Sequence, residues 1–67
     1  MKELTMGAAV RTNDRWRAFF KTDDIISGII VGNWEYDRDT AVVRKDNGDT
    51  ELIHIDWLEP DKKMRGK

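Results

Sequence analysis

The feature that most constrains the fold of this chain is a series of short runs of β-branched and other apolar residues, separated by turn residues. The longest run spans 25–36, and two further runs span 40–45 and 50–55. The last two runs flank an Asp46-Asn47-Gly48-Asp49 segment. An Asn-Gly pair between two alternating apolar runs is a strong signal of a tight β-hairpin. The pattern therefore predicts an all-β fold, in the form of a small and strongly bent β-barrel.

Two glycines punctuate the longest run. Gly28 and Gly32 lie four residues apart, so both are expected on one face of that strand. A strand position without a β-carbon allows another backbone to approach and allows the strand to coil. The Asp37-Arg38-Asp39 segment that follows is rich in turn-forming residues and predicts the connection to the next strand.

The first part of the chain gives weaker signals. A first strand is expected over 6–11, followed by a long connection over 12–24. Within this connection Asn13 or Asp14 is suited to cap one helical turn over 15–20. The alternative is an ordered excursion without a helix.

The end of the chain predicts the closing elements. Residues 56–58 suit a single 3₁₀ turn, and a short closing strand ends at Pro60. Residues 6–60 are therefore expected to form one domain. It is flanked by an N-terminal tail over 1–5 and by a basic, disordered tail over 61–67.

The alternation of side chains along the strands assigns an interior and an exterior. The interior is expected to contain five aliphatic residues together with Val10 and Trp34: Ile30, Val43, Ile53, Ile55 and Leu58. Four apolar residues and one histidine are expected on the outer surface of the sheet: Ile29, Val31, Val42, Leu52 and His54. A contiguous apolar surface of this kind usually marks an interface.

The composition limits the ways in which so small a domain can be reinforced. The chain has 67 residues, no cysteine and one histidine. Domains of this size are marginally stable and usually rely on disulfides, metal or oligomerisation. Disulfides and structural zinc are excluded, so we expect self-association and neither metal nor cofactor. The chain lacks a signal peptide and an apolar run of the ~20 residues that span a membrane, which predicts a cytoplasmic protein.

The charges are segregated along the chain, although the formal net charge is only -1. Residues 1–22 and 62–67 are basic, whereas residues 23–61 carry most of the acidic side chains. Such a field can orient the encounter with a charged partner. The alternative is that the charges serve only to keep a small domain soluble.

A basic and aromatic segment follows the first predicted strand. Its candidate nucleic-acid-binding residues are Arg11, Arg15, Trp16, Arg17, Phe19 and Lys21. Cations neutralise phosphates while rings stack on unpaired bases, so this segment and the basic tail over 62–67 are compatible with nucleic-acid binding. The alternative is that Trp16 and either Phe19 or Phe20 fold back as a lid on the barrel.

Three segments carry a resemblance to a known superfamily: Met6-Gly7-x-x-Val10-Arg11, Gly28-x-Ile30-Val31-Gly32-x-Trp34 and Leu58-Glu59. With the order of elements, they resemble the SH3-like barrels, and within these the framework of the type II dihydrofolate reductases. The resemblance implies a five-stranded SH3-like barrel over 6–60. That family acts as homotetramers, but its catalytic Val-Gln-Ile-Tyr segment would fall on Thr50-Glu51-Leu52-Ile53 and its folate-binding lysine on Thr12.

Catalytic chemistry has few candidate residues. A serine hydrolase arrangement would need Ser27, His54 and Asp56 to converge. The acidic pairs lie where turns are expected and lack the spacing of a calcium-binding loop. A non-enzymatic role is therefore expected.

The leading hypothesis is a small interaction module of bacterial, phage or mobile-element type. It would bind a protein partner or itself through the outer sheet face. Nucleic-acid binding through residues 11–21 is the second hypothesis, and a reductase related to the type II dihydrofolate reductases is the third.

Overall fold

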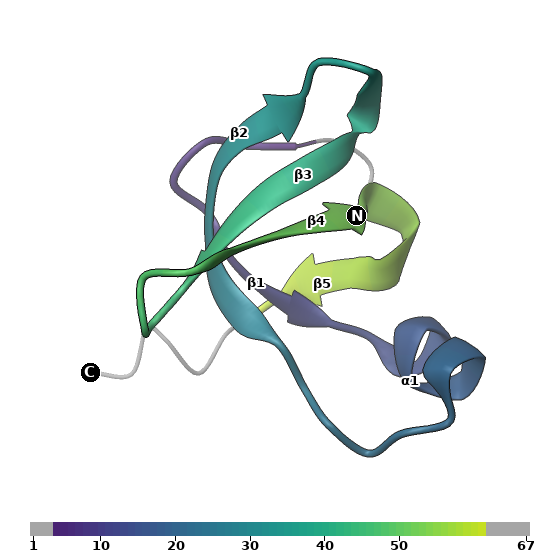
Figure 1. The fold of residues 1–67 in the computed structure, drawn as a ribbon. Helices are drawn as coiled ribbons and strands as arrows, with labels where there is room; N and C mark the ends of the chain where they lie inside the picture. Colours follow the sequence, from purple (N-terminus) through teal and green to yellow (C-terminus); the bar gives the residue numbers. More distant parts are fainter. Residues whose placement is uncertain (1–3, 62–67) are drawn as a thin grey trace.

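The structure, a computed structural model, describes residues 4–61. It contains one five-stranded sheet in the order β4-β3-β2-β1-β5, in which all neighbouring strands are antiparallel (Figure 1). The elements in chain order are β1 (Ala9–Thr12), α1 (Asp14–Phe20), β2 (Ser27–Trp34), β3 (Asp37–Lys45), β4 (Thr50–His54), η1 (Ile55–Trp57) and β5 (Leu58–Pro60). The all-β class is confirmed, as are the long connection after the first strand and the 3₁₀ turn before the last.

The core forms between the inward-facing residues of all five strands. Its buried cluster consists of Val10, Ile30, Ala41, Val43, Ile53 and Leu58, and Ile55 is buried as well. All five aliphatic residues predicted to be interior are therefore buried. The prediction for Trp34 is wrong, because this side chain is 38% exposed and its ring contacts Tyr36 instead.

Two register shifts in β2 accompany the position of Trp34. Ile30 lies opposite Val43, but the next paired residue, Gly32, lies opposite Val42, so Val31 is an extra residue in β2. An extra residue inverts the alternation of faces that follows it. Gly32 consequently lies on the outer side of the sheet rather than beside Ile30. A second register shift follows between Asn33 and Trp34, which pairs with Asp37, and Trp34 lies outside the core.

Only one of the two strand glycines permits a close backbone approach. A β-carbon on Gly28 would lie 2.2 Å from the carbonyl oxygen of Arg44, closer than any real contact. A β-carbon on Gly32 would have no atom within 4 Å. The expectation is therefore confirmed at Gly28 and wrong at Gly32.

The two hairpins differ in how closely they follow the prediction. Gly48 has a φ of +94° and donates its N–H to the Lys45 carbonyl at 2.9 Å, while the Lys45 N–H donates to the Asp49 carbonyl at 2.8 Å. This is the predicted Asn-Gly hairpin, in its three-residue form with a left-handed glycine. The preceding turn was expected over 37–39, but Asp37 already pairs with Trp34 and the turn lies at 35–36.

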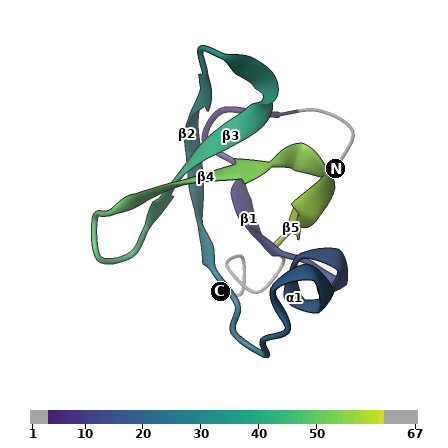
Figure 2. The same ribbon diagram turned by 45° about the vertical axis from the view of Figure 1, so that its right-hand side comes forward.

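Helix α1 begins at an Asn13 cap, one of the two predicted caps. The Asn13 side-chain oxygen accepts the N–H of Trp16 at 3.1 Å. Its amide donates to the Asp56 carbonyl at 2.9 Å, which ties the start of α1 to η1. Figure 2 shows α1 beside the end of β1 and β5, away from the β2–β3 hairpin. No helix within residues 4–61 is long and apolar enough to cross a membrane.

The folded region is slightly wider than residues 6–60. Leu4 packs against the core, and the Thr5 carbonyl accepts the N–H of Ala8 at 3.1 Å. Asp61 is buried and donates its N–H to the Ala9 carbonyl at 3.0 Å. The tails were expected over 1–5 and 61–67, and of these residues 1–3 and 62–67 lie outside the described part of the chain.

Candidate functional site

Four apolar side chains from three adjacent strands form a surface that we call the outer apolar face: Ile29, Val31, Val42 and Leu52. Val42 in β3 lies opposite Leu52 in β4 on one side and opposite Gly32 in β2 on the other. Leu52 is 50% exposed and Val31 45% exposed, while Ile29 and Val42 are half-buried. The structure therefore places these four residues on one surface, as the alternation predicted.

The outer apolar face has charged groups at both ends. Ile29 lies opposite Arg44, and His54 lies opposite Thr40 at the far end of β4.

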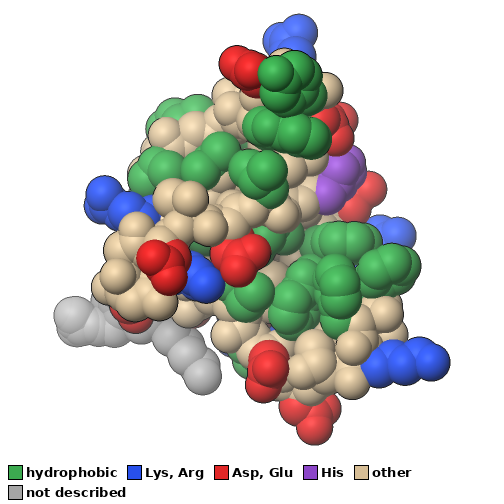
Figure 3. Space-filling view, in the orientation of Figure 1, with side chains coloured by type: hydrophobic (Ala, Val, Ile, Leu, Met, Phe, Trp, Pro, Cys, Tyr) green, Lys and Arg blue, Asp and Glu red, His purple; other side chains and the backbone are tan. Residues whose placement is uncertain are grey.

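In Figure 3, hydrophobic side chains gather over the strands and, separately, at the lower right where α1 lies. The rings of α1 instead contact Trp57 in η1, and Val31 and Leu52 remain 45% and 50% exposed. The long connection therefore does not cover this face through its aromatic residues.

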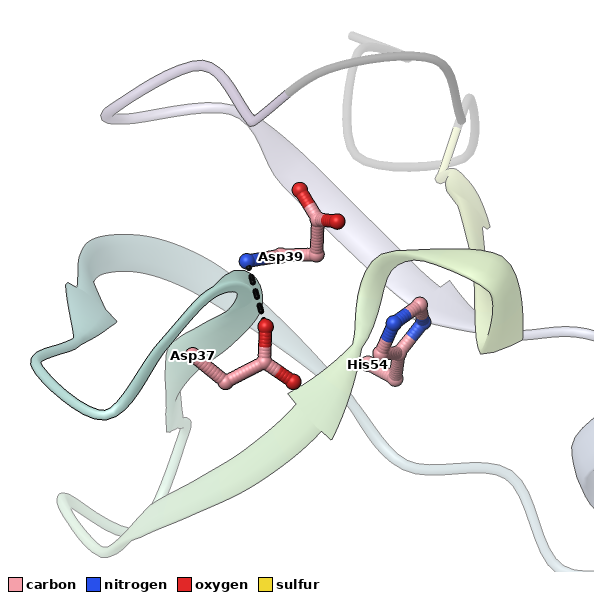
Figure 4. A group of neighbouring side chains, drawn as sticks. All are labelled: Asp37, Asp39 and His54. Carbon is pink, nitrogen blue, oxygen red and sulfur yellow. Dashed lines mark hydrogen bonds between the residues drawn. The ribbon is translucent and has the colours of Figure 1, made fainter.

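His54 lies beside two carboxylates at the surface. The ligand-type atoms of Asp37, Asp39 and His54 are within 4.8 Å of one another (Figure 4). The Asp37 carboxylate accepts the Asp39 N–H and the Thr40 hydroxyl, both at 3.0 Å. These two hydrogen bonds favour the ionised form and hold the pKa of Asp37 below its usual value, with a smaller contribution from nearby His54.

The hydrogen bonding of His54 argues against a metal centre at this group. His54 Nδ1 accepts the N–H of Asp56 at 3.0 Å and caps η1. In the neutral imidazole the proton is then on Nε2, which acts as a donor and not as a metal ligand. Ligation through Nε2 would require the proton to move to Nδ1, and the cap would be lost. The group is better described as a polar rim of the outer apolar face.

A second exposed surface consists of four rings, which we call the aromatic cluster: Trp16, Phe19, Phe20 and Trp57. The centroid of Phe19 is 5.2 Å from Trp57 and 4.9 Å from Phe20, and Phe20 is 5.1 Å from Trp16. Phe19 is 65% exposed. Sequence reasoning missed the role of Trp57; the signal was a large ring in the 3₁₀ turn just before the last strand.

The cations near the aromatic cluster are only partly available to a ligand. Arg11 forms an ion pair with Glu59 at 2.6 Å. Arg17 pairs with Asp14 and donates to the Thr12 carbonyl at 3.0 Å. Arg15 and Lys21 form no side-chain ion pair or hydrogen bond with the part of the chain that the structure describes. Two of the four predicted nucleic-acid-binding cations are therefore neutralised locally.

The residues of the hydrolase alternative are not brought together. Ser27 lies opposite Arg11 at the start of β2, whereas His54 lies at the end of β4, and β3 separates the two strands. Ser27 instead lines a shallow depression with Ile25, Lys45 and Asn47.

The chain matches no protein-family model, no curated protein and no solved structure. Its function must be inferred from its own surfaces.

Proposed function

We propose that this protein is a non-enzymatic protein-binding module and that its docking surface is the outer apolar face. The observation that carries the proposal is the Val42–Leu52 cross-strand pair, which lies beside Val31 on a surface that the aromatic residues of α1 do not cover. Small soluble domains rarely leave contiguous apolar surface in contact with water unless it binds something. Burial of such side chains contributes roughly 25 cal/mol per Å².

The groups around the outer apolar face support binding in one orientation. Arg44 at one end and the Asp37, Asp39 and His54 group at the other give the surface a positive and a mainly negative end. Charged rims contribute less to affinity than to the selection and orientation of a partner. The partner surface is therefore expected to be apolar at its centre and basic where it meets Asp37 and Asp39.

The arrangement of strands also supports the SH3-like relationship inferred from the sequence. The chain crosses β1, β2, β3 and β4 in succession and returns β5 to the other side of β1. We retain this relationship as part of the proposal. The reductase alternative has no counterpart of the catalytic segment at 50–53, and Thr12 is buried rather than presented to a substrate.

A charge placed on the outer apolar face tests the proposal. Affinity-tagged wild type, Val31→Lys and Tyr36→Lys are compared for the proteins that they retain when expressed in the native host. Val31→Lys should lower the recovery of the specific partner at least roughly tenfold, because a buried unpaired charge costs several kcal/mol. Tyr36 is 75% exposed and lies at the β2–β3 turn, so Tyr36→Lys is the matched control. Equal recovery with Val31→Lys would refute the proposal.

Nucleic-acid binding at the aromatic cluster is a second candidate function. The specific observation is that Phe19 is largely exposed on the same helix as Arg15, and Lys21 follows at its C-terminal cap. A single-stranded oligonucleotide should bind at low salt and lose affinity in Phe19→Ala. Arg15→Ala should reduce the slope of log affinity against log salt by about 0.7 if it contacts one phosphate. Absence of binding at low salt would remove this candidate.

A further inference from the structure

Strand β4 has one unpaired edge. It is the first strand of the sheet, and among the strands of residues 4–61 it pairs with β3 alone. The Lys45 N–H bond to the Asp49 carbonyl, at 2.8 Å, identifies 45 and 49 as a hydrogen-bonded pair. Hydrogen-bonded and non-hydrogen-bonded residue pairs alternate in an antiparallel ladder. The Val43–Glu51 and Ala41–Ile53 pairs are therefore hydrogen-bonded, and the N–H and C=O groups of Glu51 and Ile53 point toward β3. The main-chain groups of Thr50, Leu52 and His54 point away from the sheet.

These outward groups have no main-chain partner within residues 4–61. They form a row of alternating donors and acceptors, and such a row is a template for a further strand. The side chain of Leu52 stands beside them on the outer apolar face. The open edge and the proposed docking surface are therefore continuous.

The opposite edge of the sheet cannot accept a strand in the same way. The Asp61 N–H donates to the Ala9 carbonyl and the Asn13 N–H donates to the Trp57 carbonyl. These two hydrogen-bonded pairs flank the Arg11–Glu59 pair at a distance of two residues, so the N–H and C=O groups of Glu59 point toward β1. Leu58 and Pro60 then point outward. Pro60 has no N–H, and the Leu58 N–H donates to the Ile55 carbonyl at the end of η1. This edge offers no N–H to a neighbour, a usual protection against edge pairing.

We propose that the β4 edge binds the β4 edge of a second copy of this chain in antiparallel orientation, about a two-fold axis at Leu52. This inference rests on the proposed function, since edge pairing would join the outer apolar faces of two copies into one larger docking surface. In this register Leu52 faces Leu52 of the second copy, and Thr50 faces His54 of the second copy. Each facing pair exchanges two main-chain hydrogen bonds, as a self-complementary two-fold interface requires.

The side chains favour this register over its neighbours. With Leu52 on the axis, the outward residues meet as Leu–Leu and Thr–His pairs, without like charges. A shift that places Thr50 on the axis would set Glu51 opposite Asp49 of the second copy, which is unfavourable. A shift that places His54 on the axis would set Asp56 opposite Leu52. Only the first register joins the two outer apolar faces into one apolar surface.

Solution mass and amide hydrogen exchange test the inference together. The mass of the wild type should rise from monomer to dimer as its concentration increases. Over the same range the amides of Leu52 and His54 should become protected, whereas those of Glu51 and Ile53 should be protected at every concentration because they bond to β3. Constant monomer mass up to millimolar concentration would overturn the inference. It would leave the proposed function to be decided by the Val31→Lys comparison.

A backbone ester at Leu52, introduced by chemical synthesis, removes the outward N–H and retains the side chain. It should weaken the dimer roughly tenfold or more, because two hydrogen bonds are lost across the axis. It should destabilise the dilute monomer only slightly, because it removes no N–H that bonds to β3 and only weakens the Glu51 carbonyl as an acceptor. An ester at Ile53 is the matched control and should destabilise the monomer. If the dimer keeps its affinity with the Leu52 ester but does not form in Val31→Lys, the two copies bind through their outer apolar faces and not through their β4 edges. That result would overturn edge pairing and support the proposed function.

Discussion

Val42 and Leu52 are direct cross-strand partners whose side chains lie on the outer surface of the sheet. The residue on the other side of Val42 is Gly32, which adds no side chain, and the bulged Val31 stands next to it in β2. A row of apolar groups therefore crosses three strands, and Leu52, the most exposed of them, lies on the open edge. This arrangement connects the docking surface to the strand edge that a second copy would use.

Ile53 and Leu52 are neighbours in sequence on opposite faces of β4, which makes them a matched pair for a stability test. Ile53 is 3% exposed and belongs to the core cluster. Ile53→Ala should lower the free energy of unfolding by about 2–5 kcal/mol through lost burial and a cavity. Leu52→Ala should change it by less than about 1 kcal/mol. Urea unfolding at low protein concentration measures both, and equal losses would contradict the assigned faces.

The two strand glycines give a second matched pair. Gly28→Ala places a methyl group 2.2 Å from the Arg44 carbonyl oxygen, so β2 and β3 must separate. We expect a loss of at least about 1–3 kcal/mol, as for other overpacked sites. Gly32→Ala meets no atom within 4 Å and should be close to neutral. Thermal unfolding of both variants decides this, and a tolerated Gly28→Ala would refute the observed β2–β3 approach.

Asp37 should make stability depend on pH in the acid range. Its pKa is lowered first by the Asp39 N–H and then by the Thr40 hydroxyl, so the folded protein favours the carboxylate. The contribution is present above the unfolded pKa of about 4 and is lost as the pH falls through the lower folded pKa. Asp37→Asn should be less stable than wild type at neutral pH, and the difference should close below about pH 4. Denaturant titrations at several pH values measure it, and a constant difference would contradict the assignment.

Asn13 joins α1 to η1 through its two side-chain hydrogen bonds. Asn13→Ala should cost about 0.5–2 kcal/mol, as other lost helix caps do. The packing of Phe19 on Trp57 should loosen with it, which tryptophan fluorescence and near-ultraviolet circular dichroism would report. Asn13→Asp is the comparison, because it keeps the acceptor for Trp16 but sets a carboxylate oxygen against the Asp56 carbonyl, so it should retain the cap and loosen α1 from η1. An unchanged Trp57 environment in Asn13→Ala would show that the cap does not position the aromatic cluster.

The sequence pattern was sufficient for most of the core and for the outer surface. Period-two alternation in β3 and β4 assigns Val43 and Ile53 inward and Val42 and Leu52 outward, and the structure agrees. The bulge at Val31 could not be predicted in the same way. Residues 29–31 are all apolar and β-branched. A regular strand and a strand with an extra residue at Val31 would both bury an apolar side chain here, so the sequence pattern does not distinguish the two registers.

Other differences arise from contacts between residues distant in sequence. The rings of α1 pack on Trp57 in η1, and Asn13 holds the start of the helix there through its bonds to the Asp56 and Trp57 carbonyls. No local pattern encodes these long-range contacts. The turn was expected over 37–39, but the structure has it at 35–36. Asp37 has its side chain bonded to Asp39 and Thr40, so it begins β3 rather than standing in the turn.

Photocrosslinking at position 31 tests the central claim most directly. A photoreactive amino acid replaces Val31 in one variant and Tyr36 in another, and both are irradiated in the native host. A surface that docks a protein should give one dominant crosslinked product from position 31, either a partner or a second copy of this chain, and little product from position 36. Equal products from both positions, or no product from position 31, would contradict the outer apolar face as the docking surface.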